Sequence, residues 1–167
     1  MPNLIQYTDF SGTARIQKDN NTVQKFDAIR DEKESEFMAN VLGAELSELL
    51  YADLDSNGVP QTARFTDIYE AFKLDLNCSV YQSLGIKKMC VYIVWFFYAR
   101  DNNISIAVGG NFSGKSQNAD QASDPANLAK NYNKGVKTAR AIQNYIEENS
   151  SDYPEYNGQY LSLMDIF

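Results

Sequence analysis

The sequence predicts an all-α fold, a helical bundle of about four helices with an irregular or hairpin-containing N-terminal arm and an extended C-terminal arm. Three observations lead to this prediction. Between residues 27 and 50, apolar residues recur at three- and four-residue spacings within a charged stretch. The run MCVYIVWFFYA at 89–99 carries no charge, as is typical of a helix buried on every side. Asp124-Pro125 is a strong helix start, and an amphipathic pattern follows it.

The length of 167 residues, 44% of them hydrophobic, is enough for one globular domain. We divide it into an N-terminal arm of residues 1–26, a helical domain of residues 27–149 and a C-terminal arm of residues 150–167. The N-terminal arm mixes short β-like pieces with polar turn signals. The C-terminal arm is rich in turn residues and then apolar to its last residue.

The expected helices follow one another along residues 27–149. The first runs from residue 27 to about residue 50 and ends at the loop DSNGVPQT. The second is shorter and lies within residues 65–76, where apolar residues repeat the helical spacing. The third spans residues 84–100, and the last spans residues 125–149 with apolar residues on one face and lysines on another.

The net charge of −7 is unevenly distributed. Residues 27–55 hold nine acids and two bases, whereas the remainder balances thirteen against thirteen. An acidic surface repels nucleic acid, so any contact with DNA should be non-adhesive. The acidic stripe and the lysines of the last helix are each interpreted first as a solvated face. The alternative is a subunit or lumen face, in which the acids face a partner or a DNA channel and the lysines contact those acids between subunits. These residues are Asp31, Glu32, Glu34 and Glu36, and Lys130, Lys134 and Lys137.

Catalytic chemistry is disfavoured by the composition. The sequence contains no histidine, which removes the usual general base and the usual metal ligand. Cys78 and Cys90 stand in apolar surroundings without a C-x-x-C partner and are expected to be buried, reduced thiols. The sequence therefore predicts no enzyme, no metal and no cofactor. The apolar run 89–99 is too short to span a membrane.

Two short motifs suggest ligands, and we interpret both as turns. The segment GGNFSGKS at 109–116 fits the phosphate-binding pattern G-x-x-x-x-G-K-[ST], but a polar stretch follows it where a helix should start. A small nucleotide-binding protein remains the alternative. The segment DLDSNG at 53–58 fits the first half of a calcium loop, yet Arg64 stands where the bidentate glutamate is needed. A turn that ends a helix explains these letters.

The order of three segments resembles a known family. They are IRDEKESEFMANVLGAEL at 29–46, with its Leu-Gly pair, GIKKMCVYIVWFFYAR at 85–100, followed by a Gly-Gly loop and SGKSQNADQ, and YNKGVKTARAIQNYIEEN at 132–149, closed by YPEYNG. In this order they resemble the head-to-tail connector adaptors of tailed double-stranded DNA phages, particularly those of crAss-like and related Bacteroidetes phages. The resemblance covers most of residues 25–158.

The resemblance implies an α-helical virion protein without a catalytic site. Members form a closed homo-oligomeric ring in the neck, below the portal, and we expect a dodecamer assembled in the cytoplasm of a bacterial host. The implied partners are other copies of the chain, the portal protein and further neck or tail proteins, with packaged DNA passing through without specific binding. GGNFSGKS would then be a turn between helices, and Lys115 would touch no phosphate. A cytoplasmic helical regulator is a further alternative.

The C-terminal arm is expected to dock on a neighbouring protein, foremost the portal. Its apolar residues are too many to leave in water at a chain end. The alternative is that the arm folds back over its own bundle as a strand or cap. The docking residues are predicted to be Tyr153, Tyr156, Leu161, Leu163, Met164, Ile166 and Phe167.

Overall fold

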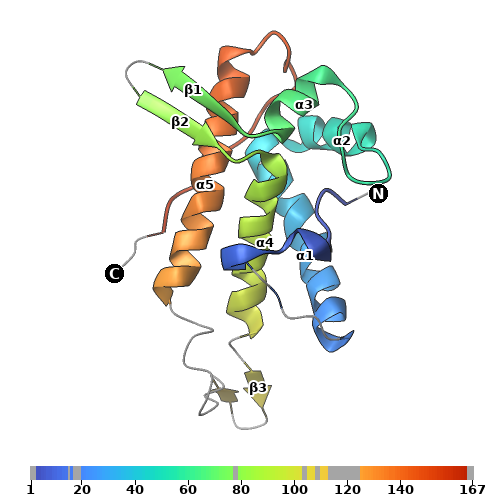
Figure 1. Ribbon diagram of the computed structural model, residues 1–167, viewed down its shortest axis with the longest axis vertical. Helices are drawn as coiled ribbons and strands as arrows, with labels where there is room; N and C mark the ends of the chain where they lie inside the picture. Colours follow the sequence, from blue (N-terminus) through green and yellow to red (C-terminus); the bar gives the residue numbers. More distant parts are fainter. Residues whose placement is uncertain are drawn as a thin grey trace.

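Three long helices form the body of the protein in the computed structural model. The helices are α1 (Asn20–Leu42), α4 (Ile86–Asn102) and α5 (Pro125–Glu148), and α4 lies between the other two (Figure 1). The structure describes residues 3–14, 16, 20–76, 79–102, 105–107, 110–112 and 125–164.

Helix α4 is the centre of the core, as the uncharged run in its sequence predicted. Its residues Met89, Cys90, Ile93 and Val94 are at most 1% exposed, and Trp95 is 8% exposed. These side chains pack between α1 and α5, so the bundle buries α4 nearly all round. Within the described residues, no helix is both long enough and apolar enough to cross a membrane.

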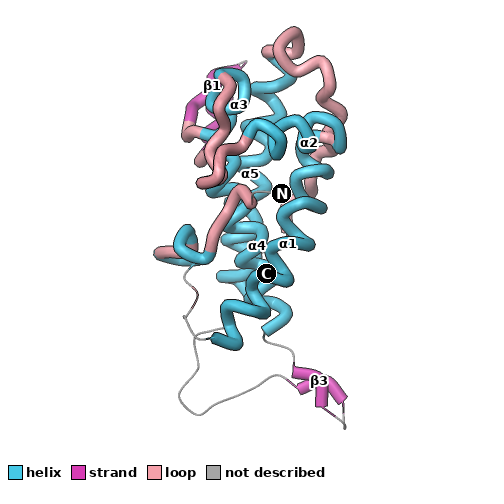
Figure 2. The backbone as a smooth tube through the Cα atoms, turned by 90° about the vertical axis from the view of Figure 1, so that its right-hand side faces the viewer, coloured by secondary structure: helices cyan, strands magenta, loops and turns pink. Residues whose placement is uncertain are grey.

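The predicted first helix is divided into two at Gly43. Helix α1 begins earlier than expected and ends at Leu42, and α2 (Ala44–Asp53) follows in a different direction (Figure 2). Gly43 has a φ of 87°, a backbone conformation that residues with a Cβ rarely adopt. A Cβ there would also lie 2.9 Å from the backbone nitrogen of Asn157. The apolar spacing continues through the break, so it did not reveal the change of direction.

The predicted second helix was wrong in its second half. Helix α3 (Ala63–Tyr69) is short, and β1 (Phe72–Leu76) then pairs antiparallel with β2 (Ser79–Ser83). In β1 the more buried residues alternate with exposed Lys73 and Asp75, which is the period of a strand. This hairpin packs on α5, so the fold is mostly helical rather than all-α.

The N-terminal arm is irregular and lies against the core. Its described residues include two single turns of 3-10 helix, η1 (Tyr7–Asp9) and η2 (Gly12–Ala14), and the side chains of Leu4 and Ile5 are fully buried. Between α4 and α5, β3 (Ser105–Ala107) and β4 (Gly110–Phe112) form a second antiparallel hairpin. The short elements α2, α3 and β1 gather at one end of the long helices (Figures 1 and 2).

Candidate functional site

A groove of about 710 Å³ lies between α1 and α2. The change of direction at Gly43 creates it, because α2 leaves the line of α1. Its carboxyl groups come from Asp31, Glu34 and Glu36 on α1 and from Glu48 on α2. We call this hollow the acidic groove.

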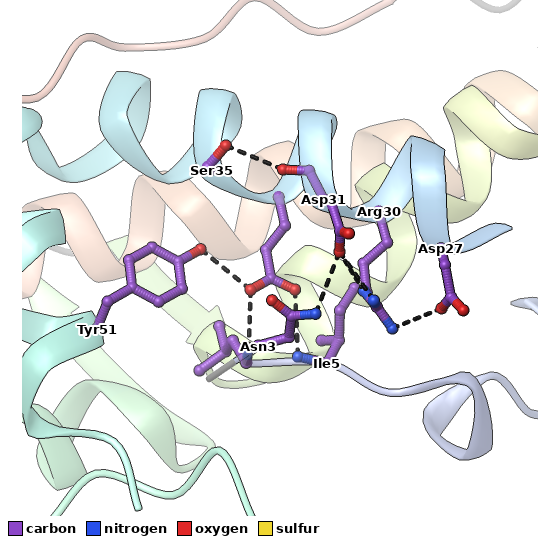
Figure 3. A network of polar contacts seen from close by, with 9 residues as sticks. Asn3, Ile5, Asp27, Arg30, Asp31, Ser35 and Tyr51 are labelled. Carbon is purple, nitrogen blue, oxygen red and sulfur yellow. Dashed lines mark hydrogen bonds and ion pairs between the residues drawn. The ribbon is translucent and has the colours of Figure 1, made fainter. Parts of the chain in front are cut away.

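The basic residue Arg30 is turned along α1 rather than into the solvent. Its guanidinium pairs with Asp27 and Asp31 at 2.8 Å each and lies 5.7 Å from the centre of the Phe26 ring (Figure 3). Asn3 of the N-terminal arm also donates to Asp31, at 3.1 Å. Asp31 therefore has donors of its own at the rim of the acidic groove.

Lys33 is directed toward the bundle in a similar way. It pairs with Glu32 at 2.7 Å and with Glu36 at 2.8 Å, and its ammonium lies 5.3 Å from the Phe97 ring of α4. The hydrogen bonds that Lys33 donates to these two glutamates raise its pKa. Among the carboxyl groups that line the groove, Glu48 alone has no hydrogen bond or ion pair to a described residue.

Glu34 is buried, so its assignment to a subunit or lumen face was wrong. The residue is only 3% exposed, and its carboxylate accepts hydrogen bonds from the backbone N–H groups of Leu4, at 2.8 Å, and Ile5, at 3.2 Å. The hydroxyl of Tyr51 donates a third, at 3.1 Å (Figure 3). The hydrogen bonds of Glu34 thus connect the N-terminal arm, α1 and α2. Its position four residues before the fully buried Met38 was a helical-spacing signal for this.

Burial raises the pKa of Glu34 above its ordinary value, and the hydrogen bonds from Leu4, Ile5 and Tyr51 partly offset this effect. Burial likewise raises the pKa of the Tyr51 hydroxyl. The hydroxyl therefore remains a proton donor to the carboxyl group across the ordinary pH range.

The pH dependence of stability should report the raised pKa of Glu34. Because the folded pKa exceeds the ordinary 4.5, the folded state binds this proton more tightly than the unfolded state. The free energy of unfolding of the wild type, relative to Glu34→Gln, should be highest below pH 4.5 and fall as the pH rises through the folded pKa. Urea denaturation of both proteins across this pH range measures the difference in their free energies of unfolding. Groups that titrate in the same way in both proteins cancel, so the difference reports Glu34. A difference that rises with pH would contradict the assignment.

Asp31, Glu32 and Glu36 remain exposed on α1, with side-chain exposures of 60%, 69% and 58%. A residue of a subunit or lumen face must be exposed in the single chain, so these exposures are compatible with the assignment. The assignment itself stays a prediction.

The three lysines of the predicted face lie on α5, and α4 lies between α5 and α1 (Figure 1). Lys130 and Lys137 are exposed, and no described residue forms an ion pair with either. Lys134 is half-buried, with its ammonium 5.1 Å from the centre of the Tyr92 ring of α4. We call Lys130 and Lys137 the lysine face.

Residues 153–164, which we call the C-terminal strap, fold back over their own chain. Tyr153 is buried, and its hydroxyl donates to the backbone oxygen of Arg64. The backbone N–H of Gln159 then donates to the oxygen of Asn40 at 2.7 Å, near the end of α1. Docking of Tyr153 on a neighbouring protein was therefore the wrong prediction, because its side chain is part of this chain's own core.

The last part of the C-terminal strap runs along α5. Arg140 donates to the backbone oxygen of Leu161 at 2.8 Å, and Asn133 exchanges two hydrogen bonds of 2.8 Å with the backbone of Met164. Tyr156 and Leu161 are half-buried against the core, and burial raises the pKa of Tyr156 to about 12.

Two apolar residues of the C-terminal strap face outward. Leu163 is 40% exposed and Met164 is 38% exposed, so their docking on a neighbour stays a prediction. The other two predicted docking residues, Ile166 and Phe167, lie outside the described residues.

The calcium-like segment is a turn, as its sequence predicted. One carboxylate oxygen of Asp53 accepts hydrogen bonds from the backbone N–H groups of Gln61 and Thr62, at 2.8 and 2.9 Å, at the start of α3. The backbone N–H groups of Val59 and Asn57 donate to Asp55 and lower its pKa. The carboxylates of both aspartates thus accept hydrogen bonds from backbone N–H groups of the turn.

Replacing Asp53 with alanine should lower the free energy of unfolding by about 1 kcal/mol, because backbone donors at the start of α3 lose their acceptor. Asp75→Ala is the matched control, since Asp75 is exposed on β1 and has no hydrogen bond to a described side chain. Thermal melts of both variants measure the effect, and calcium should leave the wild-type melting temperature unchanged. A calcium-dependent rise in that temperature would overturn the interpretation as a turn.

The phosphate-loop motif falls largely outside the described residues. Gly110 and Asn111 belong to β4, whereas Lys115 and Ser116 are not described. Cys90 is a free thiol that is buried beside Met38, and burial raises its pKa well above the usual value. Such a thiol is unreactive. Cys78 is not among the described residues.

Comparisons of the chain with protein-family models, with curated proteins and with solved structures find no match. The described residues contain no group of three or more acidic or cysteine side chains arranged to hold a metal ion.

Proposed function

We propose that this chain is a structural virion protein that forms a ring in the head-to-tail connector of a tailed double-stranded DNA phage. One observation carries the proposal: two surfaces of opposite charge, the acidic groove and the lysine face, lie on different helices of one bundle. The acidic groove lies between α1 and α2, the lysine face lies on α5, and α4 lies between α1 and α5 (Figure 1). In a ring, each copy can therefore offer its acidic groove to one neighbour and its lysine face to the other.

Contacts of this head-to-tail kind close into a ring when the rotation between copies divides a full turn. The ring encloses a channel, and the net charge of −7 suits a channel for DNA. Phosphates that meet carboxylates release few counterions and bind weakly, so the DNA passes without adhering. Asp31, Glu32 and Glu36 are the residues that we assign to the subunit or lumen face.

The proposed ring lies in the neck of the virion, where it extends the channel of the portal towards the tail. Its partners are other copies of the chain in a dodecamer, the portal protein on one side and further neck or tail proteins on the other. The order of sequence segments supports this placement through the resemblance to connector adaptors. The role is structural, without a catalytic site or cofactor.

Electron micrographs of the purified chain, alone and mixed with the portal protein, test the function. We expect closed rings with a central hole, and light scattering should give the mass of a dodecamer. Calorimetry should show no magnesium-dependent ATP binding. A chain that stays monomeric under both conditions would contradict the proposal, and micromolar ATP affinity that is lost in Lys115→Ala would favour the nucleotide-binding alternative.

A further inference from the structure

We infer that the acidic groove of one copy receives the lysine face and the outward side chains of the C-terminal strap of the next copy. This inference rests on the proposed ring and names the pair of surfaces that closes it. The inserted surface consists of Lys130, Lys137, Leu163 and Met164.

The inserted surface is continuous because one residue joins its two parts. Asn133 lies three residues after Lys130 and four before Lys137, so the three share one side of α5. The same Asn133 side chain both donates to and accepts from the backbone of Met164, at 2.8 Å each way. The half-exposed Leu163 and Met164 are therefore held beside the two exposed lysines.

The receiving surface complements this arrangement in charge. Arg30 and Lys33, the basic residues of α1 nearest the acidic groove, lie against aromatic rings of their own chain. Glu48 lines the groove and has no hydrogen bond or ion pair to a described residue. The residue is exposed, so its carboxylate is accessible to a cation from outside.

The groove also offers apolar surface to the strap. Ala39 of α1 and Ala44 of α2 line it. Leu163 and Met164 would lose their contact with water there, which favours association. Opposite charges at the edge of such a contact set its register and exclude wrong partners.

A second copy fits both surfaces at once, which a nucleic acid or a small cation does not. DNA would meet the lysine face but be repelled by the acidic groove of the same molecule. A small cation would occupy the groove and leave Leu163 and Met164 uncovered. A second copy brings lysines to the acids of the groove and apolar residues to its apolar surface at the same time.

Two charge reversals test the inferred pair. Glu48→Lys and Lys137→Glu each place like charges across the contact, so each variant alone should assemble at least tenfold more weakly than the wild type, under the condition in which the wild type forms rings. The double variant should recover most of the assembly. An equimolar mixture of the two single variants should also form rings, because every contact in an alternating ring then pairs opposite charges. Sedimentation velocity measures the assembled fraction.

Matched controls separate this pair from a general effect of charge. Glu45→Lys changes an exposed acid of α2 that does not line the groove, and Lys73→Glu changes an exposed lysine of β1. Both controls should assemble like the wild type, and all variants should keep the wild-type melting temperature as monomers. If Lys137→Glu assembles normally while the wild type forms rings, the inferred pair is wrong and the proposed function stands. If the wild type itself never assembles, the proposed function fails.

Discussion

Replacing Trp95 with alanine should lower the free energy of unfolding by about 3 to 5 kcal/mol. Trp95 lies on α4, the helix that packs between α1 and α5, and it is only 8% exposed. Truncation removes the buried indole and leaves a cavity that the two flanking helices can fill only partly. This loss is a large share of the stability of a domain of this size.

Urea denaturation monitored by far-ultraviolet circular dichroism measures the effect, because the variant has no tryptophan to report by fluorescence. Val80→Ala is the control, since Val80 is 68% exposed on β2 and its truncation should change stability by less than about 0.5 kcal/mol. A loss below about 1 kcal/mol for Trp95→Ala would show that α4 is not tightly enclosed.

Replacing Gly158 with alanine should detach the C-terminal strap and lower the free energy of unfolding by about 3 kcal/mol, the upper end of the cost of overpacking. An added Cβ would overlap the backbone carbonyl of Val41, which cannot rotate away as a side chain could. The strap would have to leave α1, and the hydrogen bonds from Asn157 to Leu42 and from Gln159 to Asn40 would be lost with it.

Gly12→Ala is the matched control for Gly158→Ala, because a Cβ on Gly12 meets no atom within 4 Å. Its cost should be limited to the positive φ of 63°, about 1 to 2 kcal/mol. Hydrogen exchange of the Gln159 amide should accelerate in Gly158→Ala and stay unchanged in Gly12→Ala. Equal stability of the two variants would contradict the close contact between the strap and α1.

Helices α4 and α5 could be predicted from sequence because the sequence pattern of each is compatible with only one kind of structure. An uncharged run as long as that of α4 must be covered on all sides, and Asp-Pro satisfies the free amides of a helix start. Strand β1 was missed because Phe72 and Leu76 fit both a helical and an alternating spacing. Lys73 and Asp75 between them were the better signal, since they alternate with the apolar residues.

The parts that could not be predicted depend on contacts between distant segments. The N-terminal arm approaches Glu34 only after the chain has folded, so its charge and its place in DEKESE indicated a solvated residue. The strap lies on α1 because Gly158 leaves room for the carbonyl of Val41. Helical spacing also continues across Gly43, so the acidic groove that opens there has no signature in the periodicity.

A cryo-electron microscopy map of the neck of phage particles that contain this chain tests the proposed function most directly. The proposal predicts a closed ring of copies next to the portal, with the acidic groove of each copy against the α5 helix of the next and with carboxylates toward the DNA channel. A neck map in which other chains account for every ring would contradict it.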